Sequence, residues 1–472
     1  MPETVILRFR DHRTDVDTIK AHAILIRKFK YVWWGWWRKD SEPRHKTIIQ
    51  ELGERARKNE LEIGLFDLST SRYFVASASD FLPNSRSRGS PDAKRTPSYY
   101  PDSRKVEAWI KLDTIKNVSL AEFIRKFGEP PISEHTFFPI SKEHKSRETK
   151  PEDFTRVRSD CVVHISDIHL GADHGFPLKK YIGKDDPVIE RVKRDINAIC
   201  EGKIGLIVVS GDLGSRGDGN TLLIEGLDFL NALHRELEVP KEAMLVIPGN
   251  HDFRLSEYQP TDFSHERPFN TTLREFYGAY DPDERFRRFV FPSGRHVEFL
   301  LINSVRLRKT EEANYGYVEW PLYESRLRAR RPDADVTRIA VLHHHLISMP
   351  REELLNNDYC HAALSTTIDS GAVIEGLQAH GFRLALHGHQ HVPGIARISR
   401  GVIDGNNEAN EPNDLEVLSA GSAGAKIERL SNAMRDNSYN FLRFEKERIH
   451  IEARRYNSGA DGRRHFVTSV QY

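Results

Sequence analysis

The chain has 472 residues, of which 38% are hydrophobic and 10% aromatic, and its formal net charge is +1. This length exceeds that of one ordinary domain and predicts two, with enough apolar residues for a sizeable core. A charge so close to zero excludes a global field that would draw the protein to nucleic acid or to a membrane. Local basic clusters remain at residues 86–105 and 443–464.

The cysteines and the apolar stretches indicate a cellular location. Cys161, Cys200 and Cys360 are scattered, odd in number and set in apolar contexts. We expect them to be buried small hydrophobic residues in a reducing compartment. No apolar stretch approaches the ~20 residues of a membrane span, and the N-terminal residues are charged. The sequence therefore predicts a soluble cytoplasmic protein without a membrane partner, and it gives no indication of the oligomeric state.

The first 140 residues mix strand and helix patterns, which predicts a smaller α+β domain. Residues 84–101 are rich in Ser, Pro and Arg and are expected to form a mobile loop. Residues 141–159 are charged and nearly free of large apolar groups, which is typical of a linker, so the first domain is expected to end at residue 140. Strands are predicted at residues 5–9, 31–37, 62–68, 73–79 and 106–112, and helices at residues 17–30, 48–58 and 120–127.

Residues 160–472 are predicted to form a second domain, in which apolar strands alternate with amphipathic helices. Continuous apolar strands separated by helices indicate parallel strands covered on both faces, and therefore an α/β fold. The strands at 439–444 and 448–453 alternate charged and apolar residues and are expected to pair as an antiparallel hairpin with one wet face. Other strands are predicted at residues 162–165, 206–210, 244–247, 297–302, 339–342 and 383–386, and helices at residues 187–200 and 222–234.

Five apolar runs of the second domain end in side chains that commonly bind metals. In open α/β sheets, sites form beyond the carboxyl ends of the strands, so these side chains are expected to meet. On extended backbone, residues two apart point to the same side, as Asp167 and His169 would, and likewise His389 and His391. The candidate metal ligands are Asp167, His169, Asp212, Asn250, His343, His389 and His391.

The candidate ligands combine imidazole, carboxylate and one amide. This mixture suits transition metals such as Mn, Fe or Zn better than calcium or a lone magnesium ion. No cysteine lies among the candidates, which argues against a structural zinc site. Gly211, Gly249 and Gly388 would permit tight turns where the chain approaches the ions closely. The ordered set of motifs, each after a strand, predicts a pair of metal ions.

The motifs Asp-x-His, Gly-Asp, Gly-Asn-His, a His after a strand and Gly-His-x-His resemble the calcineurin-like metallophosphoesterase family over roughly residues 160–455. The stretches VLHHHL and LHGHQHV are most similar to bacterial cyclic-nucleotide-type phosphodiesterases. The resemblance implies a two-sheet β-sandwich flanked by helices. It also implies one metal ion on Asp167, His169 and His391, a second on Asn250, His343 and His389, and Asp212 bridging the two.

One position departs from the family pattern. The family often has His-His-Pro where this chain has His343-His344-His345. We favour His343 as the metal ligand because it directly follows the predicted strand, with His344 as the alternative. His345 is then expected in the pocket wall or behind the ligands.

The resemblance implies phosphoester hydrolysis. Two metal ions about 3.5–4 Å apart share a water molecule and lower its pKa towards neutrality, and the resulting hydroxide attacks phosphorus in line. His251, next to Asn250, is the candidate general acid or transition-state stabiliser. Asp252 is expected either to orient His251 or to cap the local turn.

The near-neutral charge and the absence of a long basic groove favour a small substrate, most of all a phosphodiester of a small nucleotide. A metal-dependent nuclease, which would make nucleic acid the partner, and a phosphoprotein phosphatase are alternative enzymes. A non-enzymatic alternative is a nucleotide-binding sensor with a structural metal site. Specificity is expected to come from residues 213–220, 253–280 and 347–367, with Arg216, Arg254, Tyr315, Tyr317 and His361 as candidate substrate contacts.

A run of tryptophans, Trp33-Trp34-Gly35-Trp36-Trp37, stands out in the first domain. It is expected either to pack in the core of a small barrel or to offer an aromatic platform for a base. The succession of strands, with TPSYYPDS before VEAWIKL, resembles PUA/EVE-type modules that read modified bases. That resemblance implies a sensor or recruiting domain attached to the hydrolase.

Overall fold

The computed structural model divides the chain into two compact units. The first unit comprises residues 1–150, 260–263 and 321–331, and the second comprises the remaining residues. The expected domain boundary at residue 140 stays a prediction, because residues 141–153 lie outside the described part of the chain. The structure describes residues 3–9, 17–38, 42–58, 61–67, 72–84, 89–100, 106–128, 135–140, 154–178, 187–215, 219–253, 267–278, 285–305, 315–329, 335–347, 366–399, 414–430, 436–456 and 463–471.

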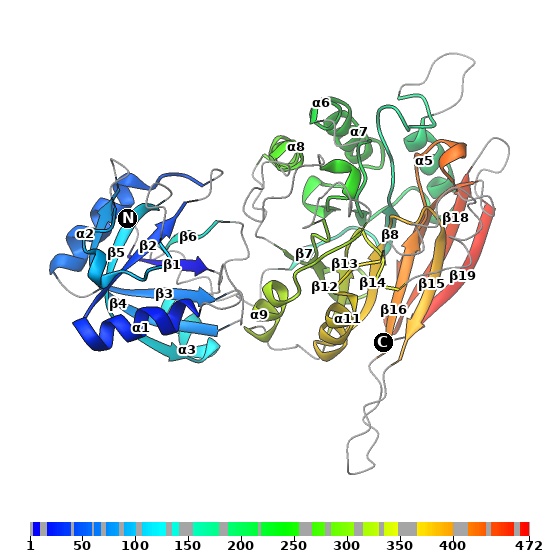
Figure 1. Ribbon diagram of the computed structural model, residues 1–472. Helices are drawn as coiled ribbons and strands as arrows, with labels where there is room; N and C mark the ends of the chain where they lie inside the picture. Colours follow the sequence, from blue (N-terminus) through cyan, green and yellow to red (C-terminus); the bar gives the residue numbers. More distant parts are fainter. Residues whose placement is uncertain are drawn as a thin grey trace, which may run out of the picture. The chain divides into compact units, whose positions relative to one another are not determined.

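The first unit is built on one six-stranded sheet with the strand order β2-β5-β4-β3-β1-β6 (Figure 1). Only the β1–β3 pair is parallel, and the other pairs are antiparallel. The strands are β1 (Thr4–Phe9), β2 (Val32–Trp37), β3 (Leu61–Asp67), β4 (Arg72–Pro83), β5 (Val106–Val118) and β6 (Phe137–Ile140). The helices are α1 (Thr18–Phe29), α2 (Lys46–Lys58), η1 (Ala93–Arg95), α3 (Leu120–Phe127) and α9 (Pro321–Ala329).

The tryptophan run forms β2 and packs in the core. Trp34 and Trp36 are 4% and 3% exposed and pack with Ile49 and Leu52 of α2. Trp33 is 7% exposed and clusters with Trp109 of β5. The core-packing alternative is therefore confirmed for these three tryptophans. Among the described residues no β2–β6 ladder closes the sheet into a barrel, but the two edges approach each other, since the Trp36 ring lies 4.6 Å from that of Phe137 in β6.

Tyr100 closes the free edge of β2. Its hydroxyl accepts a hydrogen bond from the Gly35 amide at 3.1 Å and donates one to the Gly35 carbonyl at 3.3 Å. A Cβ at Gly35 would lie 2.8 Å from Tyr100 Cε1, so only glycine lets the ring approach this closely. The expected mobile loop is therefore wrong for Tyr100, which is packed against the sheet because the edge strand offers it two unpaired backbone groups.

His22 lies inside the first unit. Helix α1 begins where the Asp17 carboxylate accepts a hydrogen bond from the Lys20 amide, and it presents His22 to the core with no exposed surface. The imidazole ring centre lies 4.4 Å from that of Trp34, and Nδ1 donates to the Thr18 carbonyl at 2.8 Å. Burial lowers the pKa of His22 from 6.5 to about 4.

The second unit contains two sheets, one with six strands and one with seven. Their orders are β10-β9-β8-β17-β18-β19 and β15-β16-β14-β13-β12-β11-β7. The strands are β7 (Thr155–Arg156), β8 (Cys161–Ile165), β9 (Leu206–Val209), β10 (Met244–Val246), β11 (Phe286–Val290), β12 (His296–Leu301), β13 (Val336–Val341), β14 (Phe382–His387), β15 (Pro393–Ile398), β16 (Leu415–Ala420), β17 (Asn437–Phe444), β18 (Arg448–Tyr456) and β19 (Arg463–Gln471).

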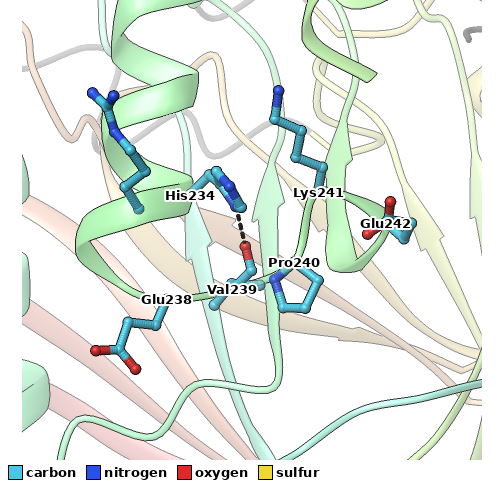
Figure 2. Close-up of a pocket in the computed structure, with 7 residues that line it drawn as sticks. His234, Glu238, Val239, Pro240, Lys241 and Glu242 are labelled. Carbon is cyan, nitrogen blue, oxygen red and sulfur yellow. Dashed lines mark hydrogen bonds between the residues drawn. The ribbon is translucent and has the colours of Figure 1, made fainter. Parts of the chain in front are cut away.

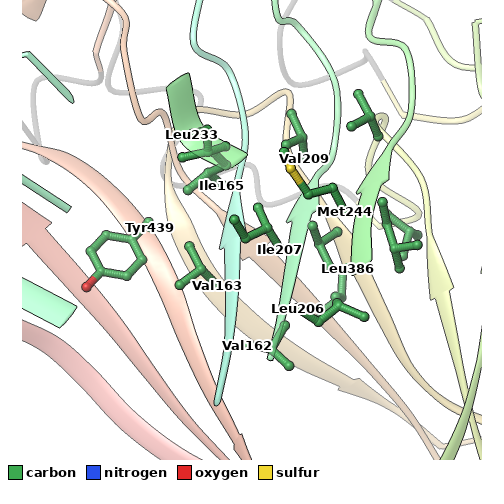
Figure 3. Close-up of a cluster of buried hydrophobic side chains, with 14 of the residues drawn as sticks. Val162, Val163, Ile165, Leu206, Ile207, Val209, Leu233, Met244, Leu386 and Tyr439 are labelled. Carbon is green, nitrogen blue, oxygen red and sulfur yellow. The ribbon is translucent and has the colours of Figure 1, made fainter. Parts of the chain in front are cut away.

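The two sheets share one hydrophobic core, so the second unit is the expected helix-flanked sandwich. Leu386 of β14 lies in the same cluster as Val163 of β8 and Ile207 of β9 (Figure 3). Leu233 of α7 belongs to this cluster too, and α11 contacts β14 and β16. The helices are α5 (Val188–Cys200), α6 (Gly219–Thr221), η3 (Leu222–Gly226), α7 (Leu227–Glu236), η4 (Lys241–Ala243), η5 (Asn250–Asp252), α8 (Arg267–Tyr277), α11 (Ser370–Ala379) and η8 (Ile427–Arg429).

The parallel arrangement predicted for the apolar strands is confirmed. β10, β9 and β8 run parallel in one sheet, and β12, β13, β14 and β16 run parallel in the other. β17 and β18 pair antiparallel as expected. The prediction that one face of this hairpin is exposed to solvent is wrong for β17, since Arg443 is its only exposed residue. The reason is α5, whose Asp195 accepts hydrogen bonds from Tyr439 at 2.7 Å and Arg454 at 2.8 Å. Among the described helices, none is long and apolar enough to span a membrane.

We predict that His22 makes the first unit less stable in acid. The unfolded chain takes up a proton near pH 6.5, whereas folded His22 does so only near pH 4. The free energy of unfolding therefore falls as the pH drops from 6.5 to 4, by about 3 kcal/mol from this group. Urea unfolding of the wild type and His22→Gln at several pH values measures the effect.

His22→Gln is expected to lose most of the pH dependence of the free energy of unfolding. The control His450→Gln, a substitution in the second unit, is expected to keep it. An NMR titration that places the pKa of the His22 imidazole in the folded chain near 6.5 would contradict the prediction.

Candidate metal centre

The predicted ligands come together at the carboxyl ends of parallel strands from both sheets. Asp167 and His169 follow β8, and Asp212 follows β9. Asn250 begins the short helix η5 after β10. His343 lies two residues beyond β13, and His389 and His391 follow β14. The strand-end rule therefore predicted the meeting place of these residues correctly.

The ligand segments are tied to one another by backbone hydrogen bonds. The Asp167 amide donates to the Gly211 carbonyl at 3.0 Å, and the His169 amide donates to the Asp212 carbonyl at 3.0 Å. The His389 amide donates to the Asp167 carboxylate at 3.0 Å, which links the ends of the two sheets. These contacts fix the spacing of the donor atoms before any ion binds.

The backbone at the candidate ligands is left-handed, and the extended conformation expected from the sequence is wrong. The φ angles are 55° at Asp167, 54° at His169, 53° at Asp212, 71° at His389 and 57° at His391. Asp and His enter this region more readily than most residues, but it is still uncommon and costs on the order of 1–3 kcal/mol per residue. Such conformations persist where the surrounding structure enforces them, which is typical of functional sites.

One group of donor atoms contains Asp167, His169 and His391. His391 Nε2 lies 3.3 Å from Asp167 Oδ1, and His169 Nε2 lies 2.9 Å from His391 Nε2. His169 Nε2 is also 3.8 Å from Asp167 Oδ1. Three donor atoms from two sheets therefore converge on one point.

A second group contains Asp212, His343 and His389. The Asn250 Oδ1 atom joins it, 3.0 Å from His343 Nε2 and 3.1 Å from His389 Nδ1. His389 and His391 thus belong to different groups, although Asp167 and His169, which have the same spacing and the same left-handed backbone, belong to one.

Asp212 faces both groups. Its Oδ2 atom lies 3.3 Å from His343 Nε2 and 3.8 Å from His169 Nε2. The carboxylate is 1% exposed, so water does not compete for it. One oxygen placed between two sets of nitrogen donors is the arrangement that a bridging carboxylate requires.

The three consecutive histidines after β13 have different surroundings. His343 Nδ1 donates to the Ser210 carbonyl at 2.8 Å, which leaves Nε2 directed at Asp212 and Asn250. His344 Nδ1 lies 2.9 Å from the Ser304 hydroxyl. His345 is buried with its ring stacked 5.7 Å from that of His389. His343 is therefore the member of the three that is best placed as a ligand.

His251 forms a third group of donor atoms with His169 and Asp212, whereas Asp252 lies beside the groups. The His251 ring lies 5.0 Å from that of His169, and the His251 amide donates to Asp212 Oδ1 at 2.7 Å. The Asp252 carboxylate accepts hydrogen bonds from the Gly214 and Gly249 amides, both at 2.8 Å. These contacts of Asp252 are those of a turn cap, the alternative that the sequence left open.

The protonation states of the cluster suit a cation. Burial alone would raise the pKa values of Asp167 and Asp212, but the neighbouring histidines outweigh it and hold both pKa values below the usual range. Burial lowers the pKa of His169 to about 3 and that of His389 far below its usual value. Although burial opposes it, Asp212 raises the pKa of His343 to about 9 and Asp167 raises the pKa of His391, so these two imidazoles are protonated when no cation is bound. Buried carboxylates beside imidazoles that give up their protons to a cation form a donor set that fits a transition metal.

A layer of buried polar side chains behind the ligands was missed in the sequence. His164 Nε2 lies 2.9 Å from the Ser210 hydroxyl, and the Asn440 side-chain amide donates to His164 Nδ1 at 3.3 Å. Because the Ser210 carbonyl accepts from His343, these residues connect β17 to a candidate ligand. His164 interrupts the otherwise apolar strand β8, which is a signal that could have revealed it, whereas Asn440 lies in a strand of mixed polarity and gave no such signal.

Several residues considered for substrate contact cannot be placed. Arg216, Arg254 and His361 lie outside the described residues. Tyr315 and Tyr317 are half-buried and flank Gly316, where a Cβ would lie 2.6 Å from His344 Cβ. This segment therefore lies against the histidines that follow β13.

A surface pocket among the described residues lies away from the donor groups. It has a volume of about 580 Å³ and is lined by residues at the end of α7 and around η4 (Figure 2). His234 Nδ1 donates to the Val239 carbonyl at 2.6 Å within it. None of its lining residues belongs to the donor groups, so it has no part in the candidate centre.

Comparison with known proteins agrees with this geometry. Residues 162–393 match the family model of the calcineurin-like phosphoesterases, and residues 5–148 match a model described as Pua-like. No protein with a curated description matches the chain. Residues 162–393 of the second unit are therefore similar to the calcineurin-like phosphoesterases, a family that hydrolyses phosphoesters with the help of divalent metal ions.

Solved structures resemble the chain only distantly. A conserved protein of Streptococcus pneumoniae TIGR4, described as a predicted phosphoesterase, is 12% identical with a TM-score of 0.26, covering 66% of this chain and 97% of that one. GAP50 of Plasmodium, described as an anchor in the inner membrane complex, is 13% identical with a TM-score of 0.36, covering 66% and 88%. Vps29 from Entamoeba histolytica with Zn²⁺ is 11% identical with a TM-score of 0.27, covering 66% and 98%. Likeness at this level does not extend to a substrate.

We predict that Gly388→Ala disrupts the donor groups. A Cβ at this position would overlap Ser166 Oγ and Asp167 Oδ2, so the loop after β14 must move away from the end of β8. The variant is expected to lose metal affinity and about 1–3 kcal/mol of stability. Metal analysis by mass spectrometry and denaturant unfolding measure both effects.

Gly371→Ala is the matched control, because a Cβ there meets no atom within 4 Å and the residue lies in α11. This control is expected to be neutral or slightly stabilising. Normal metal content and stability in Gly388→Ala would show that the loop tolerates the Cβ.

Proposed function

We propose that the second unit hydrolyses phosphodiesters of small nucleotides at a centre of two transition-metal ions. The observation that carries the proposal is the position of Asp212 Oδ2, 3.3 Å from His343 Nε2 and 3.8 Å from His169 Nε2. A carboxylate oxygen between two donor groups suits two neighbouring cations better than one. The family match of residues 162–393 supports the same reaction class.

In this proposal, Asp212 would help to hold both ions, and each ion would have a set of further ligands of its own. Bound ions of this kind polarise phosphoryl oxygens and lower the pKa of a shared water towards neutrality. Mn, Fe or Zn fits the mixture of nitrogen and oxygen donors. The first set is Asp167, His169 and His391, and the second set is Asn250, His343 and His389.

His251 is the proposed general acid or transition-state stabiliser. Its ring is half-buried, and the hydrogen bond from its amide to Asp212 keeps it beside the bridging carboxylate. From there the imidazole would donate a proton to the departing alkoxide of the ester. Asp252 would act on this step indirectly, by holding the turn through the Gly249 and Gly214 amides.

The substrate class rests on charge and on motif. With a formal net charge of +1, the protein lacks the strong positive field that helps nucleases to hold a polyanion. The motif around His343 and the Gly388–His391 stretch resemble cyclic-nucleotide-type phosphodiesterases. A small diester is therefore favoured over nucleic acid or a phosphoprotein.

We predict that the full chain, loaded with Mn²⁺, hydrolyses bis(p-nitrophenyl) phosphate and cyclic nucleotides. The variant Asp212→Asn tests whether this carboxylate bridges the two ions. Because both donor groups face this carboxylate, the variant is expected to bind less metal and to lose activity by ~10²-fold or more. His450→Gln, outside the donor groups, is the control with unchanged activity. Full metal content and activity in Asp212→Asn would refute the bridging role, and cleavage of oligonucleotides alone would favour a nuclease.

We predict that His251→Gln separates turnover from metal binding. Loss of a general acid lowers the rate by ~10²–10⁴-fold, while the ligand sets stay intact and metal content is unchanged. The loss should shrink for esters with p-nitrophenolate as leaving group, since that group departs without a proton. A parallel loss of metal would instead make His251 a ligand, in keeping with its position near His169 and Asp212.

A further inference from the structure

Cys161 and Cys200 are far apart in the sequence but meet at the start of β8. The candidate metal ligands Asp167 and His169 follow the other end of this strand. Cys161 is the first residue of β8 and is 6% exposed. Cys200 is the last residue of α5 and is half-buried. After α5 the chain reverses, and the Gly205 amide donates to the Cys161 carbonyl at 2.8 Å. The reversal brings the end of α5 beside the start of β8.

Side-chain contacts support the same proximity. Cys161 lies in the hydrophobic core cluster and Cys200 packs against that cluster, while the Cys200 thiol donates to the Ile196 carbonyl at 3.4 Å. The two thiols are close enough for each to shift the pKa of the other. Arg443 of β17 is the register partner of Cys161, so the two side chains share one face of the sheet. The Arg443 guanidinium donates to the Ile199 carbonyl at 3.1 Å, next to Cys200. Both cysteines and an arginine therefore gather at one place.

The charge distribution favours reaction at this pair. The hydrogen bond from Cys200 lowers the pKa of the Cys161 thiol, and the Arg443 charge acts in the same direction. The same contact and burial raise the pKa of Cys200. One thiolate stabilised by a second thiol and a guanidinium is the usual setting of an oxidation-sensitive cysteine, because the thiolate is the reactive form.

We propose that Cys161 and Cys200 are a thiol modification site that forms a reversible intramolecular disulfide with peroxides. The thiolate sulfur attacks the peroxide, the O–O bond breaks, and a sulfenic acid forms while the other oxygen leaves as water after taking up a proton. The second sulfur then attacks the sulfenic sulfur, the S–O bond breaks, and a second water leaves. The two thiols lose two electrons, which the peroxide gains.

The disulfide would join the two ends of the segment 161–200. This segment contains Asp167 and His169 at the far end of β8, so the cross-link closes a loop around two candidate ligands. A cross-link of this kind stabilises the folded state by restricting the unfolded chain. The proposed disulfide does not depend on the proposed hydrolysis of phosphodiesters, because the two thiols lie at the opposite end of β8 from the candidate ligands.

The experiment uses the purified full chain, treated with hydrogen peroxide after removal of reductant. Intact-mass analysis under denaturing conditions is expected to show the loss of two hydrogen atoms, and peptide mapping to show one cross-linked pair with Cys161 and Cys200. Thermal melting is expected to rise by ~2–10 °C on oxidation and to return with dithiothreitol. Cys360, which lies outside the described residues, should stay a free thiol.

Three single substitutions provide the controls. Cys360→Ser is expected to form the same disulfide, whereas Cys161→Ser and Cys200→Ser are expected to form none within the chain. The wild-type peptide map is decisive even if a variant does not fold. Retention of all three thiols, or a cross-link that involves Cys360, would overturn the proposal.

Discussion

Asp167 and Asp212 are negatively charged although they are only 0% and 1% exposed to solvent. The need to stabilise these two buried charges is the constraint around which the second unit is arranged. A carboxylate removed from water is costly unless cations or several donors surround it. Here the amides of His251 and His389 donate to the two carboxylates, and the surrounding imidazoles keep both ionised. The left-handed backbone of the ligand segments is the conformational cost of this convergence, and the shared core of the two sheets offsets it.

The sequence was informative where local pattern and chemistry coincide. Apolar runs ending in Asp, Asn or His predicted both the strands and the edge at which the ligands meet, because parallel strands place their carboxyl ends together. The choice of His343 over its neighbours followed from its place after the strand and agrees with the direction of its Nε2 atom. The same strands predicted the α/β class of the second unit, whereas its two-sheet sandwich was implied by the family resemblance.

Other features depended on contacts that no local pattern encodes. His389 and His391 belong to different donor groups, whereas Asp167 and His169, with the same spacing and similar φ angles, belong to one. The cap formed by Asp252 depends on Gly214, which is distant in sequence. The contact of His164 in β8 with Asn440 in β17 joins strands that are far apart in the sequence, and the meeting of Cys161 with Cys200 depends on how α5 returns to β8. Each of these needs the tertiary structure, since the partner lies far along the chain.

The Tyr100 hydroxyl at the edge of β2 has a consequence for solubility. An open sheet edge rich in tryptophan is a template onto which another chain can add a strand, and apolar edges of this kind lead to fibrous aggregation. By occupying both backbone groups of Gly35, one phenol denies an incoming strand its central pair of hydrogen bonds. A single side chain thereby blocks strand addition at the middle of an aromatic strand at the border of its sheet.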